Sequence, residues 1–136
     1  MKPSVKVFKV DYDRYREYRE EQSPYDGFIN LIGEDSGSTT EKEIITYDIP
    51  NGYKALVWRL KFFADQPSDV TIISRVTTEA GTTDNVLDKI KGKTEYDDDH
   101  ERLPIYVIDG NTLVVKYVQG TAGNIFIRLV IQLVKK

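Results

Sequence analysis

The segment of residues 124–134 constrains the fold of this chain more than any other stretch. It reads Asn-Ile-Phe-Ile-Arg-Leu-Val-Ile-Gln-Leu-Val. Alternate side chains of a β-strand point to opposite faces, so one face here receives only large aliphatic groups: Ile125, Ile127, Leu129, Ile131 and Leu133. The opposite face, from Phe126 to Val134, mixes polar and apolar groups and suits partial exposure or cover by another chain. The segment therefore predicts a strand of an antiparallel sheet with one buried face.

Similar β-rich segments recur along the chain, separated by turn-forming residues. Residues 111–118 form one of them, and the loop of residues 119–123 that follows contains two glycines able to supply a positive φ. Further strands are predicted over residues 5–10, 28–32, 44–49, 53–64, 70–76 and 103–108. The Asn51-Gly52 pair indicates a hairpin turn. Seven or eight strands with almost no helix predict an all-β fold, an antiparallel β-sandwich of the jelly-roll or Greek-key type.

The segments between these strands carry further predictions. Residues 33–41 and residues 65–69 are rich in turn-forming residues and predict a solvated loop and a turn. Residues 84–91 have apolar residues at helical spacing and predict at most one short helix. Residues 93–101 are polar and predict an excursion from the sheet.

The strand of residues 53–64 alternates between apolar and charged side chains. One face collects four large apolar groups: Leu56, Trp58, Leu60 and Phe62. Arg59 and Lys61 fall on the other face. The alternation therefore predicts that Trp58 belongs to the core and does not form a surface platform.

Composition limits the class of protein. A chain of 136 residues can bury a core for one domain, and the absence of cysteine excludes disulfides and thiolate metal sites. Its 19 basic and 22 acidic residues give a net charge of −3, which argues against nucleic acid as a main partner. The N-terminus lacks signal-peptide features, and no apolar run reaches the ~20 residues of a membrane span. We expect a chain that is cytoplasmic at synthesis, or a mature form already trimmed.

Residues 1–22 are predicted to form an N-terminal arm beside the sandwich domain of residues 23–136. The short strand of residues 5–10 is followed by a segment in which tyrosine recurs every third residue, with arginines between. The arm has too few aliphatic residues to form a core, so its tyrosines are expected on a surface. Because tyrosine and arginine are enriched at interface hot spots, the arm is a candidate for adding a strand to a neighbouring subunit. Packing against its own domain is the open alternative.

No pattern of catalytic residues stands out. His100 is the single histidine, and the sequence has neither a Gly-x-Ser-x-Gly motif nor a cysteine to serve as its nucleophile. The acidic run of residues 97–101 suggests calcium, but its carboxylates are consecutive and lack EF-hand spacing, so a solvated loop is favoured. No phosphate-binding glycine motif occurs. The sequence therefore predicts a protein that is not an enzyme, with no cofactor and no assigned metal site.

The whole-chain pattern resembles the small β-sandwich capsid and decoration proteins of bacterial and archaeal viruses. The resemblance rests on Leu103-Pro-Ile-Tyr-Val, on the Gly120-Thr-Ala-Gly loop, on the strand of residues 125–134 and on the terminal arm. It implies a structural subunit of a virion that associates with copies of itself or with other structural proteins of an assembly. The predicted interface residues are Val5, Val7, Tyr12, Tyr15, Arg16, Tyr18, Arg19, Phe126 and Val130.

The alternative function is a ligand-binding β-sandwich, with carbohydrate as the ligand. Aromatic side chains stack on sugar rings, so such a module needs an exposed aromatic platform. Since Trp58 is assigned to the core, the platform would come from tyrosines in loops or on less certain faces: Tyr12, Tyr15, Tyr18, Tyr25, Tyr96 or Tyr106.

Overall fold

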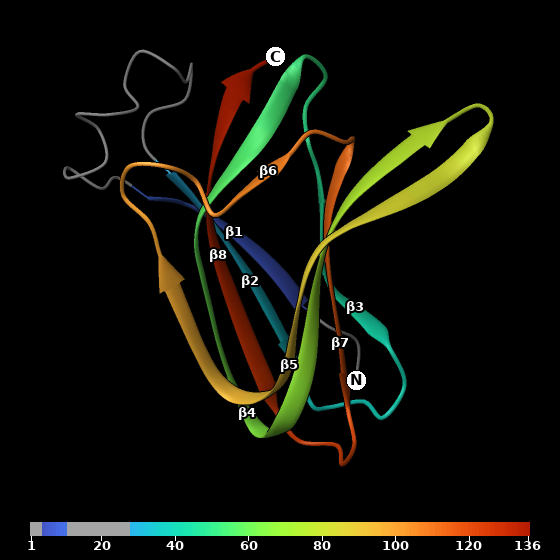
Figure 1. Ribbon diagram of the computed structural model, residues 1–136, viewed down its shortest axis with the longest axis vertical. Coiled ribbons are helices and arrows are strands. Elements are labelled where there is room, and N and C mark those ends of the chain that lie inside the picture. The colour runs from blue at the N-terminus through green and yellow to red at the C-terminus, as the bar shows by residue number, and fades with distance from the viewer. Residues whose placement is uncertain (1–3, 11–27) are drawn as a thin grey trace.

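A computed structural model describes the backbone of residues 4–10 and the whole of residues 28–136. These residues form eight strands and no helix (Figure 1). The strands are β1 (Ser4–Val10), β2 (Phe28–Asp35), β3 (Lys42–Asp48), β4 (Tyr53–Thr78), β5 (Gly81–Asp99), β6 (Tyr106–Ile108), β7 (Thr112–Gln119) and β8 (Ile125–Lys135). None of the described residues belongs to a helix that is long and apolar enough to cross a membrane.

The strands form two layers because β4 and β5 run through both of them. Residues 53–64 of β4 pair with β8, whereas residues 68–75 pair with β7. The first layer has the order β1-β2-β8-β4, followed by β6 and the end of β5; the second has the order β3-β7-β4-β5. All the pairs are antiparallel. With each bent strand counted in both layers, the first layer has five positions, the last shared by β6 and the end of β5, and the second has four. The predicted all-β, antiparallel sandwich of the jelly-roll type is therefore confirmed.

The core lies between the two layers. All five aliphatic side chains predicted for the buried face of β8, from Ile125 to Leu133, are buried there. Leu31 of β2 joins them from the first layer, while Ile72 of β4 and Val115 of β7 face them from the second. The period of two in the last strand therefore identified the core face correctly.

A β-bulge in β4 changes the face on which Trp58 lies. The pairing with β8 shifts between Val57 and Arg59, so Val57 and Leu60 both point into the core. Trp58 is buried, at 1% exposed, but in a second cluster on the outer face of the first layer. Its neighbours there are Phe28, Leu56, Val130 and Val134. The prediction that Trp58 is buried is confirmed, but its predicted phase with Leu60 and Phe62 is wrong, because one extra residue reverses the alternation.

The predicted helix at residues 84–91 is wrong. These residues belong to β5, where Val86 pairs with Ile73 and Ile90 pairs with Val70. Ile90 is buried, whereas Val86 is exposed, so the segment buries too little for an amphipathic helix. Long-range pairing with β4 outweighs a helical spacing that covers only two turns.

Four predictions for connecting segments are also corrected. The turn at residues 65–69 is a bend within β4, marked by a register break between Phe63 and Ser68. The loop at residues 33–41 begins later, because β2 continues to Asp35, and residues 93–99 continue β5. The glycines of the β7–β8 loop do not have positive φ. Gly52 does have a positive φ, of 83°, which confirms the Asn51-Gly52 turn.

Candidate functional site

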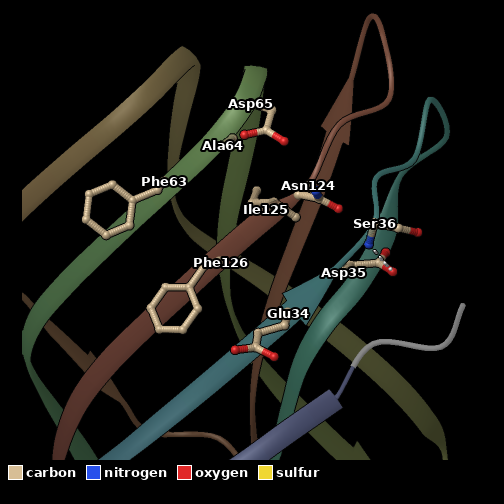
Figure 2. Close-up of a pocket in the computed structure, with 9 residues that line it drawn as sticks. All are labelled: Glu34, Asp35, Ser36, Phe63, Ala64, Asp65, Asn124, Ile125 and Phe126. Atoms are coloured by element: carbon tan, nitrogen blue, oxygen red, sulfur yellow. Dashed lines mark hydrogen bonds between the residues drawn. The ribbon is translucent and has the colours of Figure 1, made fainter.

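A hollow of about 420 Å³ opens beside the place where β4 bends (Figure 2). It is bordered by the end of β2, the middle of β4 and the start of β8. Its apolar lining comes from Phe63, Ala64, Ile125 and Phe126, and its polar lining from Glu34, Asp35, Ser36, Asp65 and Asn124. The hollow therefore combines aromatic surface with a rim of carboxylate, hydroxyl and amide groups.

The two phenylalanines project from neighbouring strands on the outer face of the first layer. Phe62 fills the core, so the next residue, Phe63, must point outward, and its side chain is 45% exposed. Phe126 is its direct partner in the β4–β8 register. The two ring centroids lie 6.5 Å apart with the ring planes at 35° (Figure 2). Together the two rings form an aromatic surface that is open to solvent.

The same cross-strand row continues to a carboxylate on each side of the two rings. Glu34 of β2 pairs with Phe126, and Glu95 of β5 pairs with Phe63. Because neighbouring strands lie about 4.8 Å apart, the four residues of this row span roughly 15 Å. The row thus places hydrogen-bond acceptors at both ends of the aromatic surface.

A second hollow, of about 400 Å³, lies on the β5 side of Phe63. Its lining consists of Lys61, Phe63, Glu95, Tyr96 and Asp97. The Nζ atom of Lys61 lies 5.0 Å from the centroid of the Phe63 ring, which is within the range of a cation–π contact. Phe63 lines both hollows, so it stands at the centre of a continuous outer surface.

Asp97 is held in place by an arginine of the neighbouring strand. Arg59 donates from Nε to Oδ1 at 3.0 Å and from Nη2 to Oδ2 at 2.8 Å. These hydrogen bonds, more than the nearby positive charges, lower the pKa of Asp97 below its ordinary value. Asp97 is therefore a fixed carboxylate at the edge of the second hollow.

The loops of the first hollow are fixed from behind by Gln119. Its Nε2 donates to Ser68 Oγ at 3.0 Å and to the Gly123 carbonyl at 3.1 Å. Its Oε1 accepts from the backbone amides of Ser38 and Gly123 at 3.2 and 3.1 Å. One buried amide therefore joins the β2–β3 loop, the bend of β4 and the β7–β8 loop, and the last of these leads into Asn124.

Asp35 reaches from the hollow into the core. It accepts a short hydrogen bond from the Tyr117 hydroxyl, and its Oδ2 lies 2.9 Å from Lys42 Nζ. Burial acts to raise the pKa of Asp35, but the hydrogen bonds from Tyr117, Lys42 and Ser36 outweigh burial and lower it. Burial and the same hydrogen bond raise the pKa of Tyr117. Asp35 is thus a charged anchor beneath the rim.

The residues predicted for an interface are not brought together at this site. Phe126 lines the first hollow, but Val130 is buried, at 2% exposed, in the cluster that contains Trp58. In β1, Val5 and Val7 pair through their backbones with Gly33 and Leu31 of the same chain. The remaining predicted residues lie outside the described part of the chain: Tyr12, Tyr15, Arg16, Tyr18 and Arg19.

The exposed aromatic surface beside the first hollow consists of phenylalanines, not of the tyrosines considered from the sequence. Tyr96 stacks on Phe62, with centroids 5.7 Å apart, and the Tyr106 hydroxyl donates to Asp88 at 2.6 Å. Tyr12, Tyr15, Tyr18 and Tyr25 lie outside the described residues. The sequence did contain one signal for Phe63: its position directly after a core phenylalanine forces it outward. Its pairing with Phe126 is long-range and leaves no local pattern.

The acidic run of residues 97–101 lies at the end of β5 and just beyond it. Its members are divided between partners, since Asp97 binds Arg59 and Asp98 Oδ1 lies 3.0 Å from His100 Nε2. Within the described part of the chain, no group of three or more His, Cys, Asp or Glu side chains is arranged to hold a metal ion. Consecutive side chains of a strand point to opposite faces, so the consecutive carboxylates of this run do not converge on one point.

Comparison with known proteins finds similar architectures at low identity. No family model and no curated protein matches the chain. Among solved structures, TmCBM61 in complex with β-1,4-galactotriose is 10% identical, with 99% of this chain and 88% of that chain covered and a TM-score of 0.32. The CBM22-1 xylan-binding domain of Paenibacillus barcinonensis Xyn10C is 13% identical, with 99% and 87% covered and a TM-score of 0.34.

A third similar structure is the enzymatically active domain of bacteriophage CBA120 tailspike protein 4. It is 14% identical, covers 98% of this chain and 19% of that chain, and has a TM-score of 0.29. These comparisons do not support the resemblance to capsid and decoration proteins.

Proposed function

We propose that this domain binds carbohydrate on the outer face of its first layer and that it works without catalysing a reaction. The observation that carries the proposal is the pair of outward rings, Phe63 and Phe126, 6.5 Å apart beside a hollow of about 420 Å³. An exposed aromatic surface costs free energy in water unless a ligand covers it. The C–H faces of a sugar ring suit such a surface, because they are apolar while the ring's edge carries hydroxyls.

The groups around the rings suit those hydroxyls. Glu34, Asp65 and Asn124 line the same hollow and supply carboxylate and amide oxygens as acceptors. The backbone N–H of Asp65 donates to the backbone carbonyl of Asn124 at 2.9 Å, and this hydrogen bond fixes the two rim residues relative to each other. A few polar groups around an apolar floor are the usual composition of a small-molecule site.

Affinity electrophoresis against a panel of neutral polysaccharides tests the proposal, followed by calorimetric titration with oligosaccharides of any polysaccharide that retards the protein. We expect retardation by at least one polysaccharide, and an affinity at least tenfold weaker for Phe63→Ala. Val86→Ala is the matched control, because Val86 is also exposed but lies on the second-layer part of β5. Equal affinity of Phe63→Ala and the unaltered protein would refute the proposed site.

Association through the N-terminal arm is a second candidate, favoured by the position of β1. This strand is the last in the first layer and, among the described strands, pairs only with β2. Its other edge can therefore accept a strand from another chain. Light scattering should show a concentration-dependent oligomer that is lost in a Tyr15→Ser/Tyr18→Ser variant. A monomer at every concentration would contradict this role.

A further inference from the structure

Two positive side chains lie opposite each other next to the aromatic pair. Lys61 of β4 and Arg128 of β8 are direct partners in the register. Each lies two residues along its strand from Phe63 or Phe126. They point to the same outer face as the rings, because residues two apart on a strand share a face. Like charges at directly opposed positions of an antiparallel pair destabilise a sheet.

The carboxylate that pairs with Lys61 in the register already binds an arginine. Asp97 pairs with Lys61 in the β4–β5 register, but both its oxygens accept hydrogen bonds from Arg59. Across the described residues, neither Lys61 nor Arg128 has a hydrogen bond or an ion pair with a carboxylate. Their charge lowers the pKa of Asp97 only through space, after the larger effect of Arg59. The pair thus retains unused capacity for an anion.

The Nε atom of Arg128 provides a second, independent observation. It is buried and has no hydrogen-bond partner within the described part of the chain. A buried donor without a partner costs free energy, and no described residue offsets that cost at Nε. A planar carboxylate suits this position, because guanidinium binds it through two parallel hydrogen bonds.

We propose that Lys61 and Arg128 form an anion subsite that binds a carboxylate substituent of the glycan whose sugar ring stacks on Phe63. This inference rests on the proposed carbohydrate binding and specifies its ligand class. The carboxylates Glu34 and Glu95 at the ends of the adjacent row disfavour a dense polyanion. The ligand class is therefore a mainly neutral glycan that carries occasional uronic acid residues.

The test compares glycans that differ only in carboxylation. Neutral glucan, galactan and mannan are each used before and after partial oxidation of their C6 hydroxyls to carboxylates. We expect the oxidised form of the recognised glycan to bind about tenfold more tightly than the neutral form at low salt, and this difference to shrink as salt is added. Lys61→Gln and Arg128→Gln should each reduce the ratio of the affinities for the oxidised and the neutral form.

Lys89→Gln is the matched control, because it removes the same charge from the exposed second-layer part of β5. It should keep the full preference for the oxidised form. Circular dichroism checks that the variants remain folded. If the neutral form binds and oxidation brings no advantage, or if Lys89→Gln abolishes the advantage as the site variants do, the anion subsite is refuted while carbohydrate binding stands. If no form of any glycan binds, both proposals fail.

Discussion

At the scale of single residues, Phe62 and Phe63 have different roles although they are neighbours in the sequence. Its neighbour Phe62 is fully buried, whereas Phe63 points to solvent beside Phe126. Alternation alone predicts this reversal, and Arg59 and Lys61 were correctly placed on the outer face. The partner ring, the acidic ends of the row and the opposed cations could not be predicted, because they depend on the register between strands far apart in sequence.

Gln119 is predicted to be the residue on which the rim loops depend. Replacement by alanine removes four hydrogen bonds, one buried and three partly buried, and leaves the backbone amides of Ser38 and Gly123 without their acceptor. We expect a loss of about 2–4 kcal/mol in the free energy of unfolding, measured by urea denaturation. Gln119→Glu keeps the acceptor but buries a carboxylate against the Gly123 carbonyl oxygen, so it should also destabilise the protein. A change below about 0.5 kcal/mol for Gln119→Ala would contradict the structural role assigned to this amide.

Asp35 is predicted to make stability depend on pH in the acid range. Because its pKa is lower in the folded chain than its ordinary value of 3.8, its contribution is complete above that value. The contribution is lost as the pH falls through the folded pKa, when the carboxylate that binds Lys42 and Tyr117 becomes protonated. Unfolding free energies measured from pH 6 to pH 2 should therefore fall less steeply in Asp35→Asn than in the unaltered protein. Parallel pH profiles would show that Asp35 does not contribute in this way.

At the scale of elements, the bends and the bulge explain where sequence reasoning failed. Turn-forming residues at 65–69 and a helical spacing at 84–91 are local signals, and both segments lie in the long β4–β5 hairpin instead. The bulge at Trp58 likewise inserts one residue without a composition that marks it. Pairing energy shared over many residues overrides weak local preferences, so the strands were predicted better than their connections.

Gly33 is predicted to control how closely β2 packs on β3. A Cβ atom at this position would lie 2.7 Å from Ile45 Cγ1 and 2.9 Å from the Ile44 carbonyl oxygen. We expect Gly33→Ala to lower the free energy of unfolding by about 1–3 kcal/mol, because backbone and a core side chain must both shift. Gly120→Ala is the control, since a Cβ there meets no atom within 4 Å. Equal stability of the two variants in urea unfolding would refute the close approach.

At the scale of the whole molecule, the jelly roll was predictable in class because most local signals favoured antiparallel strands. The spacing of turns, the lack of cysteine and the apolar period of the last strand agree with one another. The function could not be predicted from these signals, because proteins with the same fold carry many different functional sites. The aromatic, acidic and basic side chains of the outer face come together only when folding places β2, β8, β4 and β5 side by side.

The most direct measurement of the central claim is a titration followed by amide chemical shifts in two-dimensional NMR, using an oligosaccharide of the polysaccharide that retards the protein. We predict that the largest shifts fall on the ends of β2 and β8 and the bend of β4, at residues 34–36, 63–65 and 124–126. The outer face of the second layer, formed by β3 and β7, should remain unchanged. Shifts confined to that face, or no shifts at saturating oligosaccharide, would contradict the account.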